Sequence, residues 1–200
     1  EYLEYINKFN NGELEFYIDT AGCREFLFET EHEKFENEFG VTIKKEVKFL
    51  KNLYLLEHIS LYLVVILTIL AYNYWAILIV PLYYKIYFFI RARASLGYHD
   101  IFKPFIIFTL FTIIMLCFLG SHSKIIQIHF VSIQLPYFFV KLMYYYTSKY
   151  TYNILLSNYN FFAYIYLKPF QEDYPMLWTY NNVTKETDFK WKEIDLSNKN

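Results

Sequence analysis

Histidine is the residue type in this sequence that could most directly bind a metal ion or haem. His122 and His129 lie seven positions apart, which separates them by about 10.5 Å along a helix axis. Metal–ligand bonds are about 2 Å long, so this spacing is too wide for one shared ion. Two haem ligands would need similar depths on facing helices, whereas His58 and His129 are expected near opposite ends of theirs. We therefore predict no metal site, no haem site and no cofactor.

Glu57 and His58 form an adjacent acid–histidine pair at the start of a predicted membrane span. An ionisable pair inside a span could relay protons or contact a ligand, because charges are costly in hydrocarbon. Both residues are expected within about one helical turn of the interface, near Lys51, where water or an ion pair would satisfy them. We favour the structural interpretation of this pair over the functional one.

Basic residues gather between the second and third predicted spans. Arg91, Arg93 and Lys103 could hold the phosphate of a phospholipid headgroup, including that of an anionic lipid. The same charges also serve as ordinary topology signals on the cytoplasmic side of a membrane. We favour topology signalling and keep lipid binding as the alternative.

Polar residues interrupt the fourth predicted span. Gln127 and Gln134 share one helix face, and His129 lies to its side. Such residues avoid lipid and turn towards other helices or a water-filled path. We favour a packing face against another subunit, with a pore lining as the alternative.

Motifs of known enzyme classes are absent from the sequence. It contains no G-x-S-x-G, G-x-x-x-x-G-K-[ST], H-E-x-x-H or D-F-G pattern. Its two cysteines, Cys23 and Cys117, fall in a polar and an apolar region, so a disulfide between them is not expected. We predict that the chain is not an enzyme and has no catalytic residues.

The apolar segments that must position these residues are too long for a soluble core. Hydrophobic residues make up 56% of the chain, against about 45–50% in soluble domains. Ile59–Ile90 would extend about 48 Å as one helix, whereas a hydrocarbon core is about 30 Å thick. The segment must therefore fold back, and Tyr72–Trp75 supplies a turn residue and interfacial aromatics.

The same reasoning predicts four spans arranged as two hairpins. They are Leu53–Ala71, Trp75–Ile90 with a kink at Pro81, Pro104–Leu119 and Ile125–Tyr145. We therefore expect an all-α membrane protein with a small N-terminal α+β head and an extended C-terminal segment. The expected regions are an acidic head at 1–42, the four spans at 43–146, a Tyr-rich interfacial segment at 147–170 and a polar tail at 171–200.

The head contains patterns for one strand and one short helix. Leu14, Phe16 and Ile18 alternate with polar residues, as in a half-buried strand. A turn at Thr20–Gly22 would lead into a hairpin partner around Phe26 and Phe28, and Thr30 would cap a helix closed by Gly40. Residues 1–40 carry eleven acids and three bases, a difference of eight, which excludes a nucleic-acid partner.

Positive charges predict the orientation of the spans. One side of the membrane would receive nine basic residues and the other side only Lys124. The nine are Lys44, Lys45, Lys48, Lys51, Arg91, Arg93, Lys103, Lys141 and Lys149. Cytoplasmic loops carry the excess of Lys and Arg, so both termini are predicted to face the cytoplasm or the mitochondrial matrix.

The Tyr-rich region suits a membrane interface. We expect an interfacial helix over Asn153–Leu167, because tyrosine needs both apolar contact and a hydrogen bond. A fifth span over the same residues is disfavoured, since its asparagines would need partners. The region after Gln171 is expected to be extended and to lie across a neighbouring surface.

These observations favour an accessory subunit of a membrane complex. Phe, Tyr, Ile, Asn and Lys are abundant, as in A+T-rich coding, and a sequence starting at Glu1 suggests a processed or trimmed terminus. Both would fit a mitochondrial inner-membrane complex, such as a respiratory complex or the ATP synthase, with a bacterial inner membrane as the alternative. The alternative function is a small homo-oligomeric transporter or channel. The expected partners are other membrane subunits and phospholipids.

Overall fold

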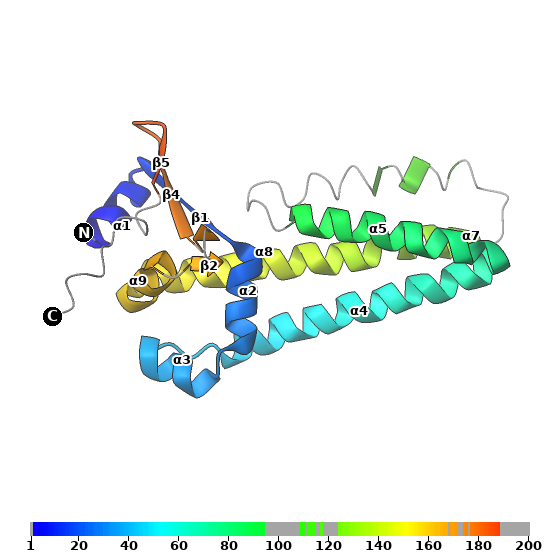
Figure 1. Ribbon diagram of the computed structural model, residues 1–200, viewed down its shortest axis with the longest axis horizontal. Helices are drawn as coiled ribbons and strands as arrows, with labels where there is room; N and C mark the ends of the chain where they lie inside the picture. The colour runs from blue at the N-terminus through cyan, green and yellow to red at the C-terminus, as the bar shows by residue number, and fades with distance from the viewer. Residues whose placement is uncertain are drawn as a thin grey trace. The chain divides into compact units, whose positions relative to one another are not determined.

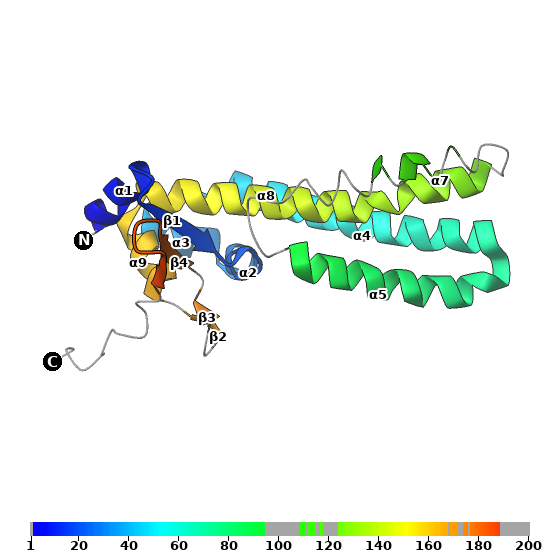
Figure 2. The same ribbon diagram turned by 90° about the horizontal axis from the view of Figure 1, so that it is seen from above.

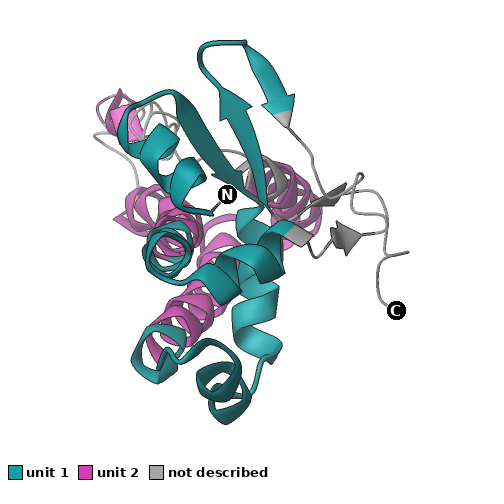
Figure 3. Cartoon of the chain, turned by 90° about the vertical axis from the view of Figure 1, so that its left-hand side faces the viewer, with its two compact units in different colours: residues 1–47, 147–200 teal, residues 48–146 magenta. Residues whose placement is uncertain are grey.

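The computed structural model describes most of the chain and divides it into two compact units (Figures 1 and 3). The described residues are 2–94, 109–110, 112–114, 117, 124–167, 169–171, 174–175 and 177–188. Unit 1 comprises residues 1–47 and 147–200, and unit 2 comprises residues 48–146. The chain is mostly helical with a small three-stranded antiparallel sheet.

Unit 1 holds the sheet and the short helices. Its elements are α1 (Tyr2–Asn10), β1 (Leu14–Ile18), α2 (Thr20–Glu29), α3 (His32–Phe39), α9 (Tyr159–Leu167), β2 (Pro169–Gln171), β3 (Tyr174–Pro175), β4 (Leu177–Asn181) and β5 (Glu186–Asp188). The sheet order is β1-β4-β5, with Leu14 opposite Asn181 and Ile18 opposite Leu177. Alternate residues of β1 are buried, which confirms the predicted period.

The predicted hairpin in the head is wrong, because the partner of β1 comes from the other end of the chain. Residues Thr20–Gly22 form the first turn of α2 and not a β-turn, since the Asp19 carboxylate accepts a hydrogen bond from the Ala21 amide at 3.1 Å and caps the helix. Strand β4 takes the place predicted for residues around Phe26 and Phe28. The sheet therefore joins segments more than 150 positions apart.

Helix α3 begins and ends as its sequence allows. Gly40 closes it with φ of 66°, in the left-handed region, as predicted. The predicted cap at Thr30 is wrong, because the N-cap residue is Glu31. The Thr30 hydroxyl instead donates to the Phe26 carbonyl at 2.7 Å, at the end of α2.

The core of unit 1 is aromatic. Phe161 of α9 lies 5.6 Å from Phe35 and 5.4 Å from Phe39, measured between ring centroids, and all three are buried. Phe162 packs against Phe16 of β1 in an edge-to-face contact. Aromatic residues of the Tyr-rich segment thus help to form a core, a role that the sequence analysis did not predict.

Unit 2 contains most of the long helices. Helix α4 (Lys44–Tyr72) starts in unit 1, and α8 (Gln134–Ser157) ends there; between them lie η1 (Asn73–Trp75), α5 (Ala76–Ala94) and α7 (Lys124–Ser132). Figure 2 shows α5 folding back along α4 after η1. The predicted reversal at Tyr72–Trp75 is confirmed, and Asn73 makes it with φ of 49°.

Contacts between side chains fix the directions of the unit 2 helices. Phe49 of α4 contacts Tyr146 of α8, and Thr68 contacts His129 of α7, so α4 runs antiparallel to the α7–α8 pair. The helix is interrupted at Ile133, between α7 and α8. Pro136 explains this break, because it lacks the N–H that would bond to the carbonyl of Ser132.

Two helical stretches of the described chain, Lys44–Phe89 and Lys124–Ser157, are long and apolar enough to cross a membrane. The first includes both predicted spans of the first hairpin. The predicted third span and the connection at Gly120–Ser123 lie largely or wholly outside the described residues. The predicted loop from Arg91 begins later than expected, because α5 continues to Ala94.

Candidate functional site

A buried carboxylate joins the two helices of the first hairpin. Glu57 of α4 is fully buried, and its Oε1 atom accepts a short hydrogen bond from the Tyr87 hydroxyl of α5. The same oxygen lies 3.1 Å from Nε of Arg91 in an ion pair. Tyr87 and Arg91 are four residues apart, so both project from one face of α5 towards α4.

This arrangement follows from the position of the turn. Glu57 lies sixteen residues before Asn73, and the equivalent position after Asn73 is residue 89, between Tyr87 and Arg91. Equal lengths of helix rise by equal amounts, so these residues must lie at the same level once the chain reverses. The sequence analysis did not predict a role for Tyr87, although counting equal numbers of residues on both sides of Asn73 would have placed it near Glu57.

Glu57 and His58 are not brought together. The His58 side chain points to another face of α4, where its Nδ1 atom lies 2.8 Å from the Tyr54 carbonyl and its ring lies 4.2 Å from the ring of Tyr54. Glu57 instead forms its ion pair with Arg91. This separation supports the structural interpretation of the pair.

The structure describes the three residues predicted to bind a lipid headgroup to different extents. Arg91 turns inward to Glu57, and its side chain is only 21% exposed. Arg93 lies in α5, but its side chain is outside the described part of the structure, and Lys103 lies wholly outside it. Of these residues, only Arg91 has a described contact, and that contact is with a carboxylate of this chain.

His129 is buried in a contact between α7 and α4. Its Nε2 atom lies 2.8 Å from the Thr68 hydroxyl, and its ring packs edge-on against Tyr72 at 5.3 Å. The Thr68 hydroxyl already donates its single hydrogen to the Val64 carbonyl at 2.7 Å, so Nε2 of His129 must be the donor.

The other two residues of the predicted polar face have separate surroundings. Gln134 Oε1 accepts a hydrogen bond from the Thr109 hydroxyl at 3.1 Å, and Gln127 is half-buried. His129 and Gln134 thus contact different segments of the same chain. Within the described residues, these contacts support a packing role for the predicted face, and they occur inside one subunit.

Cys23 does not have the surroundings of a nucleophile. Cys23 of α2 is buried in unit 1, and burial raises the pKa of its thiol to about 12, which keeps it protonated at neutral pH. Cys117 is exposed. Among the described residues, no group of three His, Cys, Asp or Glu side chains could hold a metal ion.

Comparison with known proteins gives no family for this chain. No protein-family model matches the sequence, and neither the curated proteins nor the solved structures contain a significant match. Function must therefore be argued from the chemistry of the two units.

Proposed function

We propose that this chain is a non-catalytic membrane subunit that spans the bilayer with four helices and assembles with other membrane subunits. The observation that carries the proposal is the burial pattern of unit 2. Its interior holds polar residues such as Glu57, Thr68 and His129 beside apolar ones, while its outer surface carries leucine, isoleucine and phenylalanine. Such a surface is stable in hydrocarbon and costly in water.

The polar contacts inside unit 2 support an architectural role. Hydrogen bonds and ion pairs between helices hold membrane proteins together, since lipid provides no hydrophobic force between helices. Glu57–Tyr87 and Glu57–Arg91 join α4 to α5, and His129–Thr68 joins α7 to α4. These contacts join helices of the same chain, as a scaffold requires.

The orientation and location of the chain are part of the same proposal. Both termini would face the cytoplasm or the matrix, because the basic residues flank the spans on that side. We place the protein in a mitochondrial inner membrane, with a bacterial inner membrane as the alternative.

Extraction and sizing test the proposal. The chain should stay in the pellet after carbonate washing and ultracentrifugation. In mild detergent it should migrate on native gels as part of a heteromeric complex. Release into the supernatant, or migration as a monomer, would contradict the proposal.

Labelling tests the number of spans. Single cysteines placed in 95–103 and in 120–123 of a chain lacking Cys23 and Cys117 should react with an impermeant reagent from opposite faces of sealed vesicles. Labelling of both positions from the same face would exclude two hairpins.

The transporter alternative is tested at the polar residues of the fourth span. Replacing Gln127, His129 and Gln134 by leucine should abolish flux but leave assembly intact if these residues line a pore. The packing role instead predicts that the folded chain is destabilised, because His129 and Gln134 would no longer bond to Thr68 and Thr109 of the same chain. A homo-oligomer on native sizing would favour the transporter.

A further inference from the structure

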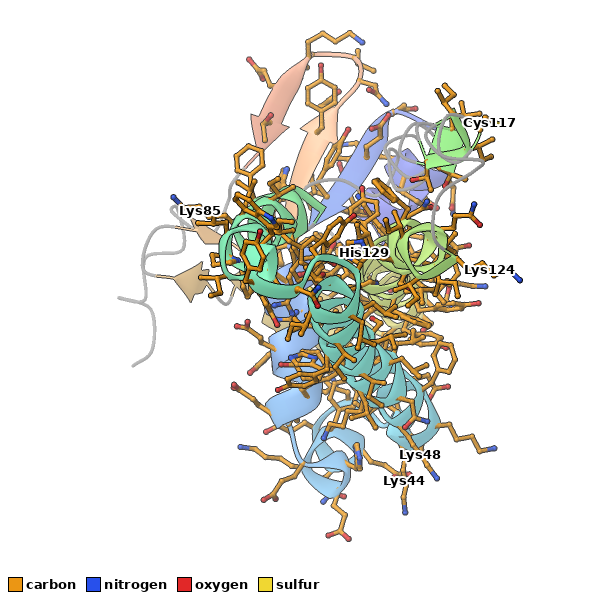
Figure 4. All side chains as sticks on the ribbon, turned by 90° about the vertical axis from the view of Figure 1, so that its right-hand side faces the viewer. Lys44, Lys48, Lys85, Cys117, Lys124 and His129 are labelled. Carbon is orange, nitrogen blue, oxygen red and sulfur yellow. The ribbon has the colours of Figure 1, made fainter. Side chains whose placement is uncertain are left out.

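One lysine lies on the apolar outer face of α5. Leu78, Leu82, Ile86 and Phe89 are all at least half exposed and share one side of the helix with Lys85. At 100° per residue these five positions span an arc of about 100°. In Figure 4 the Lys85 side chain points away from the helices of unit 2, whereas His129 lies among them.

The acidic residue of unit 2 that the structure describes, Glu57, does not pair with this lysine. Residues 48–146 contain only two acids, Glu57 and Asp100. Glu57 contacts Tyr87 and Arg91, and Tyr87 lies about 160° around the helix from Lys85. Asp100 belongs to the predicted loop and not to a span. Among the described residues, no hydrogen bond or ion pair reaches the Lys85 ammonium.

The depth of Lys85 makes an unpaired charge costly. Ten residues, or about 15 Å of helix, separate it from Trp75 at the turn, which is half of a hydrocarbon core about 30 Å thick. The interface marked by Arg91 is nearer to Lys85, at about 9 Å along the helix. However, the Cα–Cβ bonds of a helix tilt towards its N-terminus, which for α5 is the end next to Trp75. A lysine side chain must therefore turn against this tilt to reach the nearer interface.

We propose that the α5 face formed by Leu78, Leu82, Lys85, Ile86 and Phe89 binds a transmembrane helix of another subunit, whose Asp or Glu side chain pairs with Lys85. The inference rests on the proposed function, since it names the kind of partner in that complex. A carboxylate fits better than a lipid phosphate, because phosphates lie outside the hydrocarbon core, whereas Lys85 lies near its middle. The exposed apolar residues around Lys85 would exclude lipid from the pair.

Photocrosslinking in native membranes tests the proposal. A benzophenone amino acid at Leu82 of the full chain should form an adduct with a membrane protein that carries Asp or Glu within a span. Lys85→Leu and Lys85→Gln should reduce this adduct about tenfold or more, because breaking a buried charge pair weakens an interface strongly. Lys48→Leu is the matched control, since Lys48 is an exposed lysine at the basic end of α4 (Figure 4), and should leave the adduct unchanged. Exchanging the charges, with Lys85→Asp here and lysine in place of the partner's acid, should restore it.

Each other outcome overturns the inference. These outcomes are an adduct with lipid, with a second copy, within the same chain or with a helix that lacks a carboxylate, and an adduct that Lys85→Leu does not weaken. If a heteromeric complex still forms on native gels in those cases, the proposed function stands and only the inference is wrong. If no complex forms at all, both are wrong.

Discussion

The two units of this chain differ in the apolar surface that they expose. Unit 1 encloses aromatic and aliphatic residues such as Phe35, Phe161 and Leu177, and among its described residues only Leu3, Tyr159 and Val183 are large apolar side chains that remain exposed. Unit 2 encloses Glu57 and His129 and exposes most of the apolar surface of α4 and α5. The difference supports the proposal that water surrounds unit 1 and that hydrocarbon surrounds unit 2.

Truncating the aromatic core should give the largest effect and should be confined to unit 1. Phe161 is 1% exposed and contacts Phe35 and Phe39. Phe161→Ala should lower the free energy of unfolding of unit 1 by about 3–5 kcal/mol, because it removes contacts and leaves a cavity. Denaturant unfolding of the full chain in detergent, followed by limited proteolysis, would measure this. Tyr159→Ala, at an exposed position of the same helix, is the control and should cost far less.

Breaking the buried ion pair should be comparably costly in unit 2. Glu57→Leu leaves Arg91 without its carboxylate, and removing one partner of a buried pair costs about 3–5 kcal/mol. The double variant Glu57→Leu/Arg91→Leu should recover most of this loss, since no charge remains unpaired. Unfolding in detergent micelles would measure both variants. Equal losses in the single and double variants would show that the ion pair has no part in the stability of the hairpin.

Placing a charge on the outer face of α4 should affect membrane insertion. Ile66 is 55% exposed, and nine residues, or about 13.5 Å of helix, separate it from Trp75 at the turn, close to half of a hydrocarbon core about 30 Å thick. Ile66→Arg should disfavour insertion by about 2.5–3.5 kcal/mol, the cost of arginine at the centre of a span. The control change Leu3→Arg in unit 1, at a leucine that is 72% exposed, should change nothing measurable. If both variants insert like the wild-type chain, the outer face of α4 does not meet lipid.

The smallest effect concerns the thiol of Cys23. Burial raises its pKa to about 12 from 9.0, so the folded state holds this proton more tightly than the unfolded state. Stability from this group is complete below pH 9 and falls as the pH rises towards 12. Cys23→Ala should remove that part of the pH dependence. Cys23 should also resist alkylation at pH 8 until unit 1 unfolds, and rapid labelling of the folded chain would contradict its burial.

Local patterns were read correctly where short-range physics decides the structure. The alternation at Leu14–Ile18, the closure of a helix at Gly40 and the reversal at Tyr72–Trp75 depend on neighbouring residues alone, and the structure confirms all three. The hairpin partner of β1 and the cap at Thr30 were wrong because competing local choices were available. Asp19 caps the N-terminus of helix α2, at the position where a turn had been expected.

The sequence by itself determined that the chain has long apolar helices, a reversal at Asn73 and an acidic N-terminal region, because composition and hydrophobic length need no tertiary information. Only the tertiary structure decided which polar groups meet. It paired Glu57 with Tyr87 and Arg91 and not with His58, His129 with Thr68, and β1 with β4. These pairings join residues far apart in the chain. They depend on which faces of the helices and strands meet, and the residues next to each partner do not determine this.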